Sequence, residues 1–141
     1  MSPPRTHLFS KSLFQSSAPF SHVVIAAGLA HVSGVIGQRR DTGALVDPDA
    51  GIQARAMLDN LETALQEAGL SLADLVSTRL YLLDYADFET INAVYRERLS
   101  APFPARTTLQ VAALPLGARV QIDATADASG SPEIQRIHPD V

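Results

Sequence analysis

An apolar stripe with helical spacing organises the first half of the chain, from Asp49 to Ala68. Asp49 is the expected N-cap of this helix, and Gly69 stands where helices commonly stop. The pattern predicts one long amphipathic helix that buries a single face. Its apolar positions are Ile52, Ala56, Met57, Leu61, Ala64, Leu65 and Ala68.

A second stripe predicts a shorter helix after Asp87, which we expect to be its N-cap. Pro102 and Pro104 end this helix, because the residue before a proline is driven out of the helical conformation. Between the two helices, the segment from Leu75 to Leu83 reads as a strand. The second stripe consists of Phe88, Ile91, Asn92, Tyr95 and Leu99.

The remaining strands are predicted from apolar runs and from alternation. Residues 21–26 and 29–35 are apolar and are separated by Ala27-Gly28, which indicates a hairpin. Residues 103–126 contain two alternating segments around a Pro/Gly turn, and we interpret them as a second hairpin. With a short edge strand expected in residues 1–17, the order becomes β-β-β-α-β-α-β-β. This order predicts an α+β fold with a mixed sheet and two helices packed on one face.

The other face of this sheet would be left without a helical cover. We expect it to be neither core-like nor plainly solvated, so the open faces of several copies would close on one another and leave polar pockets between subunits. The polar groups expected on this face are His31, Ser33, Arg106, Thr108, Gln121 and Asp123.

Length, charge and composition narrow the function classes. With 141 residues the chain suits one domain, which we divide into an N-terminal leader with a short edge strand (1–17), a main domain (18–127) and a C-terminal tail (128–141). The net charge of −4 argues against a nucleic-acid partner. No apolar run approaches the roughly 20 residues that span a bilayer, and no secretory signal is recognised, so we expect no membrane partner and a cytoplasmic location.

The chemistry-bearing residues point away from metals. The chain has no cysteine, which excludes a disulfide framework, a thiolate zinc site and a thiol nucleophile. Its four histidines lack the spacing of metal ligands, so we expect no metal site. Arg106 is the candidate anchor of a small-molecule site, because its guanidinium can hold a carboxylate at two points. The alternative is a structural ion pair of Arg106, with Asp123 or with a carboxylate of a neighbouring subunit.

Several motifs, taken together and in order, resemble those of the Rid (YjgF) family of reactive intermediate deaminases. The resemblance covers residues 18–127. Its elements are Val32-Ser33-Gly34, Thr42-Gly43-Ala44-Leu45-Val46, the helix from Gln53 to Gly69 with Asn60-Leu61, Tyr81-Leu82-Leu83-Asp84, Asp87-Phe88, Asn92-Ala93-Val94-Tyr95, Pro104-Ala-Arg-Thr-Thr, Val111-Ala-Ala-Leu-Pro and Val120-Gln-Ile-Asp-Ala.

The resemblance implies a chorismate-mutase-like fold whose sheets form a trimeric barrel, with three sites in clefts between subunits. It also implies cofactor-free hydrolysis of small enamines and imines that carry a carboxylate, to 2-keto acids and ammonia. The family's carboxylate-binding arginine falls on Arg106, its strand-end serine on Ser33 and its helix asparagine on Asn92. We expect Asn92 to have a structural role at the pocket wall, such as a bond to a loop carbonyl.

Three positions depart from the family pattern. Phe20 stands in place of the usual tyrosine, Thr108 in place of a frequent cysteine, and Gln121 in place of the glutamate credited with activating water. A carboxylate can accept a proton from water whereas an amide only orients it, and general-base help is worth about 10²–10⁴-fold in rate. Asp123 lies two residues further along, about 6–7 Å away, and would substitute only in a differently shaped pocket.

We therefore hold two functional hypotheses. The first is an imine or enamine deaminase of weak or altered activity, in which Arg106 holds the carboxylate, Gln121 orients water, and the Thr108 hydroxyl or a nearby backbone carbonyl polarises the imine nitrogen. The second is a protein that binds a small keto acid without turning it over. A ribonuclease is disfavoured by the acidic charge.

Overall fold

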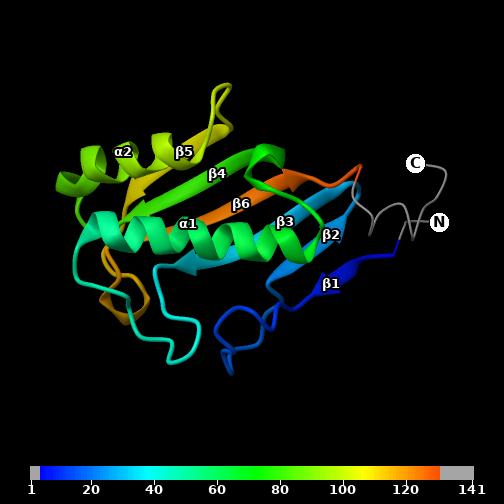
Figure 1. The fold of residues 1–141 in the computed structure, drawn as a ribbon, viewed down its shortest axis with the longest axis horizontal. Helices are drawn as coiled ribbons and strands as arrows, with labels where there is room; N and C mark the ends of the chain where they lie inside the picture. Colours follow the sequence, from blue (N-terminus) through cyan, green and yellow to red (C-terminus); the bar gives the residue numbers. More distant parts are fainter. Residues whose placement is uncertain (1–3, 131–141) are drawn as a thin grey trace.

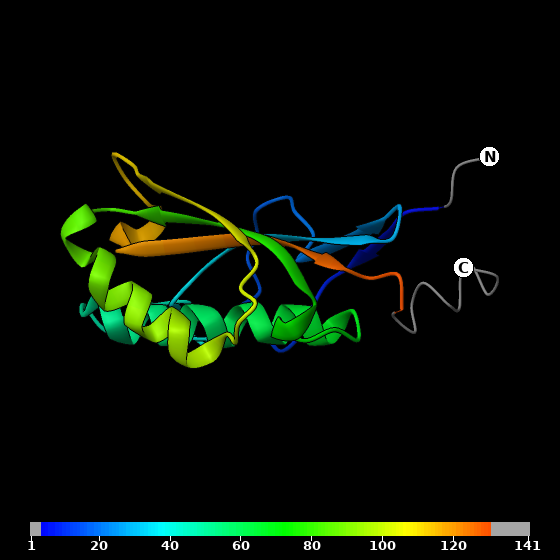
Figure 2. The same cartoon turned by 90° about the horizontal axis from the view of Figure 1, so that it is seen from above.

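The computed structural model describes residues 4–130 as a six-stranded mixed sheet with two helices on one face (Figures 1 and 2). The strand order is β1-β2-β3-β6-β4-β5. This arrangement confirms the predicted α+β class and the predicted order of elements. The elements are β1 (Thr6–Leu8), β2 (Val23–Ala26), β3 (Leu29–Ile36), α1 (Ala50–Glu67), β4 (Leu75–Leu82), α2 (Phe88–Arg98), β5 (Ala105–Gln110) and β6 (Val120–Asp127), with single 3₁₀ turns η1 (Leu72–Asp74), η2 (Tyr85–Asp87) and η3 (Pro115–Gly117).

Helix α1 begins as the sequence predicts, because the Asp49 carboxylate accepts the backbone N–H of Ile52 at 2.9 Å. Its apolar stripe packs on the sheet and forms the centre of the core. Two of its members are exceptions, since Ile52 is 47% exposed and Ala56 is only half-buried. Ala54 and Leu58 occupy the buried face instead.

Helix α2 also lies where the pattern places it, and Asp87 occupies the predicted N-cap position, but its side chain does not make the capping bond that was expected. The Asp87 carboxylate makes no bond to the helix N-terminus. It binds Arg119 instead, accepting from Nε at 2.8 Å and pairing with Nη2 at 2.7 Å. The side chain that caps the preceding turn η2 is Asp84, which accepts from the backbone N–H of Ala86.

The predicted hairpin at Ala27-Gly28 is confirmed as the β2–β3 connection. Both residues have positive φ, 53° and 77°. A two-residue turn with both φ angles positive has the twist that antiparallel strands require, and the glycine adopts this conformation without strain.

The predicted second hairpin in residues 103–126 is wrong, because β4 lies between β5 and β6. Strand β5 pairs with β4 in parallel, and α2 provides the crossover that a parallel pair needs. Strand β6 pairs with the other edge of β4 in antiparallel register. Local alternation cannot distinguish these arrangements, since it fixes which residues share a face of a strand but not which strands are neighbours.

The register also places the candidate side chains on different faces of the sheet. Buried Thr78 is opposite Arg106, so Arg106 and Thr108 lie on the face that carries the helices. Arg79 is opposite Asp123, and successive residues of a strand alternate between faces. Asp123 and Gln121 therefore lie on the open face, and the predicted placement of Arg106 and Thr108 beside them is wrong.

The described part of the chain also includes most of the predicted leader. Strand β1 pairs with β2 at the edge of the sheet. The predicted C-terminal tail lies outside the described residues beyond position 130. Among residues 4–130, no helix combines the length and the hydrophobicity needed to cross a membrane.

Candidate functional site

The Arg106 guanidinium is held at the junction of β5 and α2. Its Nε donates to the Thr108 hydroxyl at 2.8 Å, and its Nη2 donates to the side-chain oxygen of Asn92 at 2.6 Å. The central carbon lies 4.8 Å from the ring centroid of Tyr95 and 5.7 Å from that of Phe88. Cation–π contacts of this length, together with two hydrogen bonds, fix the orientation of the guanidinium.

Within residues 4–130, Arg106 has no carboxylate partner. The alternative ion pair with Asp123 is wrong, because Asp123 pairs with Arg79 on the neighbouring strand. Asp123 also accepts a hydrogen bond from the Tyr81 hydroxyl at 2.8 Å, which raises the pKa of Tyr81. Two of the five N–H groups of Arg106 are used by Thr108 and Asn92, so three remain for a ligand.

These three donors lie beside a pocket of about 440 Å³, which we call the arginine pocket. Its polar lining consists of Asn92, Arg96, Arg106 and Thr108, and no carboxylate of the described residues lines it. Burial lowers the pKa of Arg106, and the charge of Arg96 acts in the same direction. Arginine nevertheless remains protonated at neutral pH, so the pocket is positive and suits an anion.

Asn92 is a positioning residue for this arginine. Its side chain is 8% exposed, and its oxygen accepts from Arg106. The expected bond to a loop carbonyl is therefore replaced by a bond to the guanidinium. An amide oxygen that accepts from Arg106 without neutralising its charge leaves the full positive charge for a ligand.

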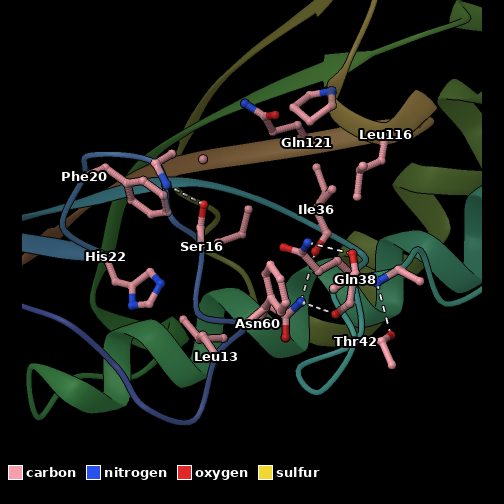
Figure 3. Close-up of a pocket in the computed structure, with 17 residues that line it drawn as sticks. Leu13, Ser16, Phe20, His22, Ile36, Gln38, Thr42, Asn60, Leu116 and Gln121 are labelled. Carbon is pink, nitrogen blue, oxygen red and sulfur yellow. Dashed lines mark hydrogen bonds between the residues drawn. The ribbon is translucent and has the colours of Figure 1, made fainter.

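Phe20 and Gln121 line a different pocket of about 620 Å³, which we call the glutamine pocket (Figure 3). In Figure 3, Phe20 stands on one side of the cavity and Leu116 on the other, with Gln121 between them. Gln121 lies against the backbone of β3, since a Cβ added to Gly34 would be only 2.6 Å from its Nε2. The remaining lining is mostly apolar and comes from the segment before β2, from β3 and the loop after it, and from α1 and η3.

Ser33 lies next to this pocket, in the irregular part of β3 between Val32 and Val35. Its hydroxyl donates to the carbonyl of Ser21 at 2.5 Å, and its backbone N–H donates to the carbonyl of His22 at 3.0 Å. These bonds fix the segment before β2 to β3. Phe20, which lines the pocket, belongs to this segment. The hydroxyl proton of Ser33 is thus already used, and only the oxygen lone pairs remain for a ligand.

The histidines have separate roles. His22 is buried against Phe9, with ring centroids 4.3 Å apart, and its Nδ1 accepts the backbone N–H of Ser10 at 2.8 Å. Burial lowers the pKa of His22, while the charge of Glu67 opposes that change. His31 is exposed and lines neither pocket. No cluster of three or more metal-ligating side chains is found in the described residues.

One chain therefore divides the predicted site residues into two groups. Arg106, Thr108 and Asn92 meet in the arginine pocket, whereas Phe20 and Gln121 meet in the glutamine pocket, and the two pockets share no lining residue. The sequence analysis did not identify the aromatic walls of the arginine pocket, since it placed Phe88 and Tyr95 only on the apolar face of the second helix. The walls are Tyr85, Phe88, Tyr95 and Phe103.

The fold and the arginine pocket define a class of small α+β protein with a site suited to an anionic ligand. The family described as Endoribonuclease L-PSP matches residues 10–128. The chain belongs to this family, and the names of its relatives confirm the resemblance to the Rid proteins.

The chain is 39% identical over 108 residues to Reactive Intermediate Deaminase A, chloroplastic, of Arabidopsis thaliana, a match that covers 77% of this chain and 58% of that protein. It is 37% identical over 108 residues to the human 2-iminobutanoate/2-iminopropanoate deaminase, covering 77% of this chain and 79% of the relative. A putative endoribonuclease L-PSP from Entamoeba histolytica has a similar crystal structure, with a TM-score of 0.83, 32% identity, and coverage of 88% of this chain and 99% of that one.

Proposed function

We propose that this protein is a hydrolytic deaminase of small imines or enamines that carry a carboxylate, and that it converts 2-imino acids to 2-keto acids and ammonia. The observation that carries the proposal is Arg106, oriented in a positive pocket with three free donors among the described residues. The names of the relatives support the same reaction class. The family description also contains the word endoribonuclease, but a net charge of −4 does not favour binding of RNA.

The active form we propose is a homotrimer with sites between subunits. In one chain, Arg106 and Gln121 lie on opposite faces of the sheet and line different pockets. A complete site needs both groups on one substrate, so the arginine pocket of one subunit has to meet Phe20, Ser33 and Gln121 of another. The residues proposed for catalysis are Arg106, Gln121 and Thr108, and those proposed for substrate binding are Arg106, Ser33, Phe20 and Asn92.

In the proposed reaction, Arg106 holds the substrate carboxylate through its free N–H groups. The Thr108 oxygen accepts from Arg106, so its hydroxyl proton is available to donate to the imine nitrogen. Water adds to C2 of the C=N bond while one of its protons passes, through the Thr108 hydroxyl, to the nitrogen, which gives a carbinolamine. The carbinolamine hydroxyl then gives its proton to the amino group, the C=O bond of the keto acid forms, and the C–N bond breaks to release ammonia. Gln121 orients the water but cannot take its proton, so it provides no general-base catalysis. The rate enhancement therefore comes from holding the substrate and the water in the reactive geometry.

The second candidate is a protein that binds a keto acid or a related carboxylate without turnover. Two features favour it: Gln121 lacks the carboxylate of a general base, and Phe20 lacks a hydroxyl that could bond substrate or water. Both candidates use the same anchor, so they differ in whether the bound molecule reacts.

One assay separates the two. An amino acid oxidase generates 2-imino acids in place, and their loss above the spontaneous rate is followed with wild type, Arg106→Ala and Gln121→Glu. The deaminase proposal predicts loss above background with wild type and background with Arg106→Ala. Equal rates for wild type and Arg106→Ala remove the anchor, whereas no turnover combined with Arg106-dependent binding of keto acids supports the binding protein. Sedimentation that gives a monomer at micromolar concentration contradicts the trimer.

A further inference from the structure

The arginine pocket is unusually rich in aromatic side chains. Four of the chain's eight aromatic residues line it: Tyr85, Phe88, Tyr95 and Phe103. Tyr95 and Phe88 lie against Arg106, at 4.8 and 5.7 Å from its central carbon to their ring centroids. They help to fix the guanidinium. Tyr85 and Phe103 make no such contact with the guanidinium.

Tyr85 and Phe103 extend the aromatic wall outward from the arginine. Tyr85 stacks on Phe88 with the ring centroids 4.9 Å apart and the planes 14° from parallel. Phe103 lies 6.4 Å from Tyr95, also between ring centroids. Their exposed fractions are 44% and 48%, so each presents a large apolar surface to the space beside Arg106.

Tyr85 is also held firmly relative to the arginine. Its backbone N–H donates to the side-chain oxygen of Gln110 at 2.7 Å, and Gln110 belongs to β5, the strand that carries Arg106. The Asp84 carboxylate caps the same turn through the backbone N–H of Ala86. The tyrosine hydroxyl makes no hydrogen bond within residues 4–130, so the fold orients the ring and leaves the hydroxyl unused.

A ligand whose carboxylate binds Arg106 would lie beside these rings. A three-carbon keto or imino acid would contact the guanidinium but has no side chain to set against Tyr85 and Phe103. A planar aromatic side chain on the same acid reaches the walls and covers them. Burial of apolar surface and aromatic stacking both favour the larger ligand.

We infer that the site selects 2-imino or 2-keto acids with an aromatic side chain, and that Tyr85 is the specificity-determining residue. This inference rests on the proposed carboxylate site at Arg106, and it goes further by assigning the side-chain class. Tyr85 provides one face of its ring to the ligand, since Phe88 already covers the other.

The test compares binding and turnover on the intact protein. Phenylpyruvate, 4-methyl-2-oxopentanoate and pyruvate are titrated into wild type, Tyr85→Ala, Tyr85→Phe and Arg106→Ala, and the corresponding imino acids, generated from phenylalanine, leucine and alanine, are assayed for loss. Phenylpyruvate should bind wild type about tenfold more tightly than pyruvate, because ring burial and stacking are each worth a few-fold or more. Tyr85→Ala should bind phenylpyruvate about tenfold more weakly than wild type does, and its affinity for pyruvate should fall by less than about twofold. Tyr85→Phe, which keeps the ring, should match wild type.

The outcomes distinguish the inference from the proposed function. Imine turnover that shows no preference among the three side chains, or that Tyr85→Ala lowers equally for all, overturns the inference and leaves the deaminase proposal intact. Tighter binding of the aromatic acid with no turnover supports the inference and overturns the deaminase proposal. Equal affinity for the leucine-derived and phenylalanine-derived acids overturns the aromatic assignment. Binding of phenylpyruvate that persists in Arg106→Ala overturns the placement of the site.

Discussion

Replacing Gln121 by glutamate tests whether this protein lacks only a general base. The substitution keeps the size of the side chain and adds a carboxylate at the edge of the glutamine pocket, beside Gly34. General-base catalysis typically contributes about 10²–10⁴-fold in rate. If water is activated at this position, Gln121→Glu should hydrolyse 2-imino acids at least about tenfold faster than wild type.

The new carboxylate has to be ionised for this effect. Its nearest acidic neighbour along β6 is Asp123, on the same face and about 6–7 Å away by strand rise. With an effective dielectric constant of 20, two such charges repel by about 2.5 kcal/mol, and the mostly apolar lining of the pocket also disfavours the charged carboxylate, so both effects raise its pKa. Arg79 pairs with Asp123 and reduces that repulsion. Because the pKa of the new carboxyl lies above the ordinary glutamate value of about 4.3, the variants are compared at pH 8, near the upper end of the pH profile.

The assay follows imine loss from pH 5 to pH 8.5, with imines generated by an amino acid oxidase and corrected for spontaneous hydrolysis. Gln121→Glu should gain rate as the pH rises through the pKa of its carboxylate and then reach a plateau, whereas wild type lacks this step. Gln66→Glu is the matched control, because it makes the same change in charge on the exposed side of α1. If Gln121→Glu is no faster than Gln66→Glu at pH 8, residue 121 does not contact the attacking water and that part of the mechanism is wrong.

Three further predictions concern positioning, pH and packing. Asn92→Ala should raise KM about tenfold with little change in kcat, since it removes a bond to a charged group that orients Arg106. Burial lowers the pKa of His22, so the unfolded chain takes up a proton more readily than the folded one. The free energy of unfolding, measured in urea, should therefore be greatest above about pH 6.5 and decrease at lower pH. Gly37→Ala should destabilise by about 1–3 kcal/mol in the same measurement, because the added Cβ would lie 2.3 Å from the backbone oxygen of Gln53.

Each of these has a simple control. For Asn92→Ala, a fall in kcat with unchanged KM would show that the amide acts on the reaction and not on the orientation of Arg106. For the acid-dependent loss, His22→Gln should flatten the pH profile between pH 5 and 7, and exposed His31→Gln should leave it unchanged. For packing, Gly130→Ala adds a Cβ in open space and should leave stability within about 0.5 kcal/mol of wild type.

Local patterns in the sequence were sufficient for the helices and for the first hairpin. The stripe from Asp49 to Ala68 and the turn at Ala27-Gly28 depend on spacing and on backbone conformation, both of which are visible over a few residues. The neighbour of β5 is not a local property. Residues 103–126 alternate in the way a hairpin would, and only the position of α2 between β4 and β5 makes a parallel pair possible.

In the candidate site, too, local features were predicted correctly and contacts between distant segments were not. The sequence motifs singled out Arg106, Asn92 and Thr108, and the structure brings these three side chains within hydrogen-bond distance. The expected proximity of Arg106 to Gln121 failed, because it assumed that β5 and β6 are neighbours. The aromatic surface of Tyr85 depends on where turn η2 docks against Gln110, a contact across 25 residues that periodicity does not reveal.

The most direct test of the central claim is a crystal structure of the protein with phenylpyruvate bound. The account predicts the ligand's carboxylate within about 3.2 Å of the free N–H groups of Arg106, with its ring against Tyr85 and with Gln121 of a second subunit facing its C2 carbon. A ligand bound elsewhere, or an Arg106 already covered by a carboxylate of the neighbouring subunit, would contradict it.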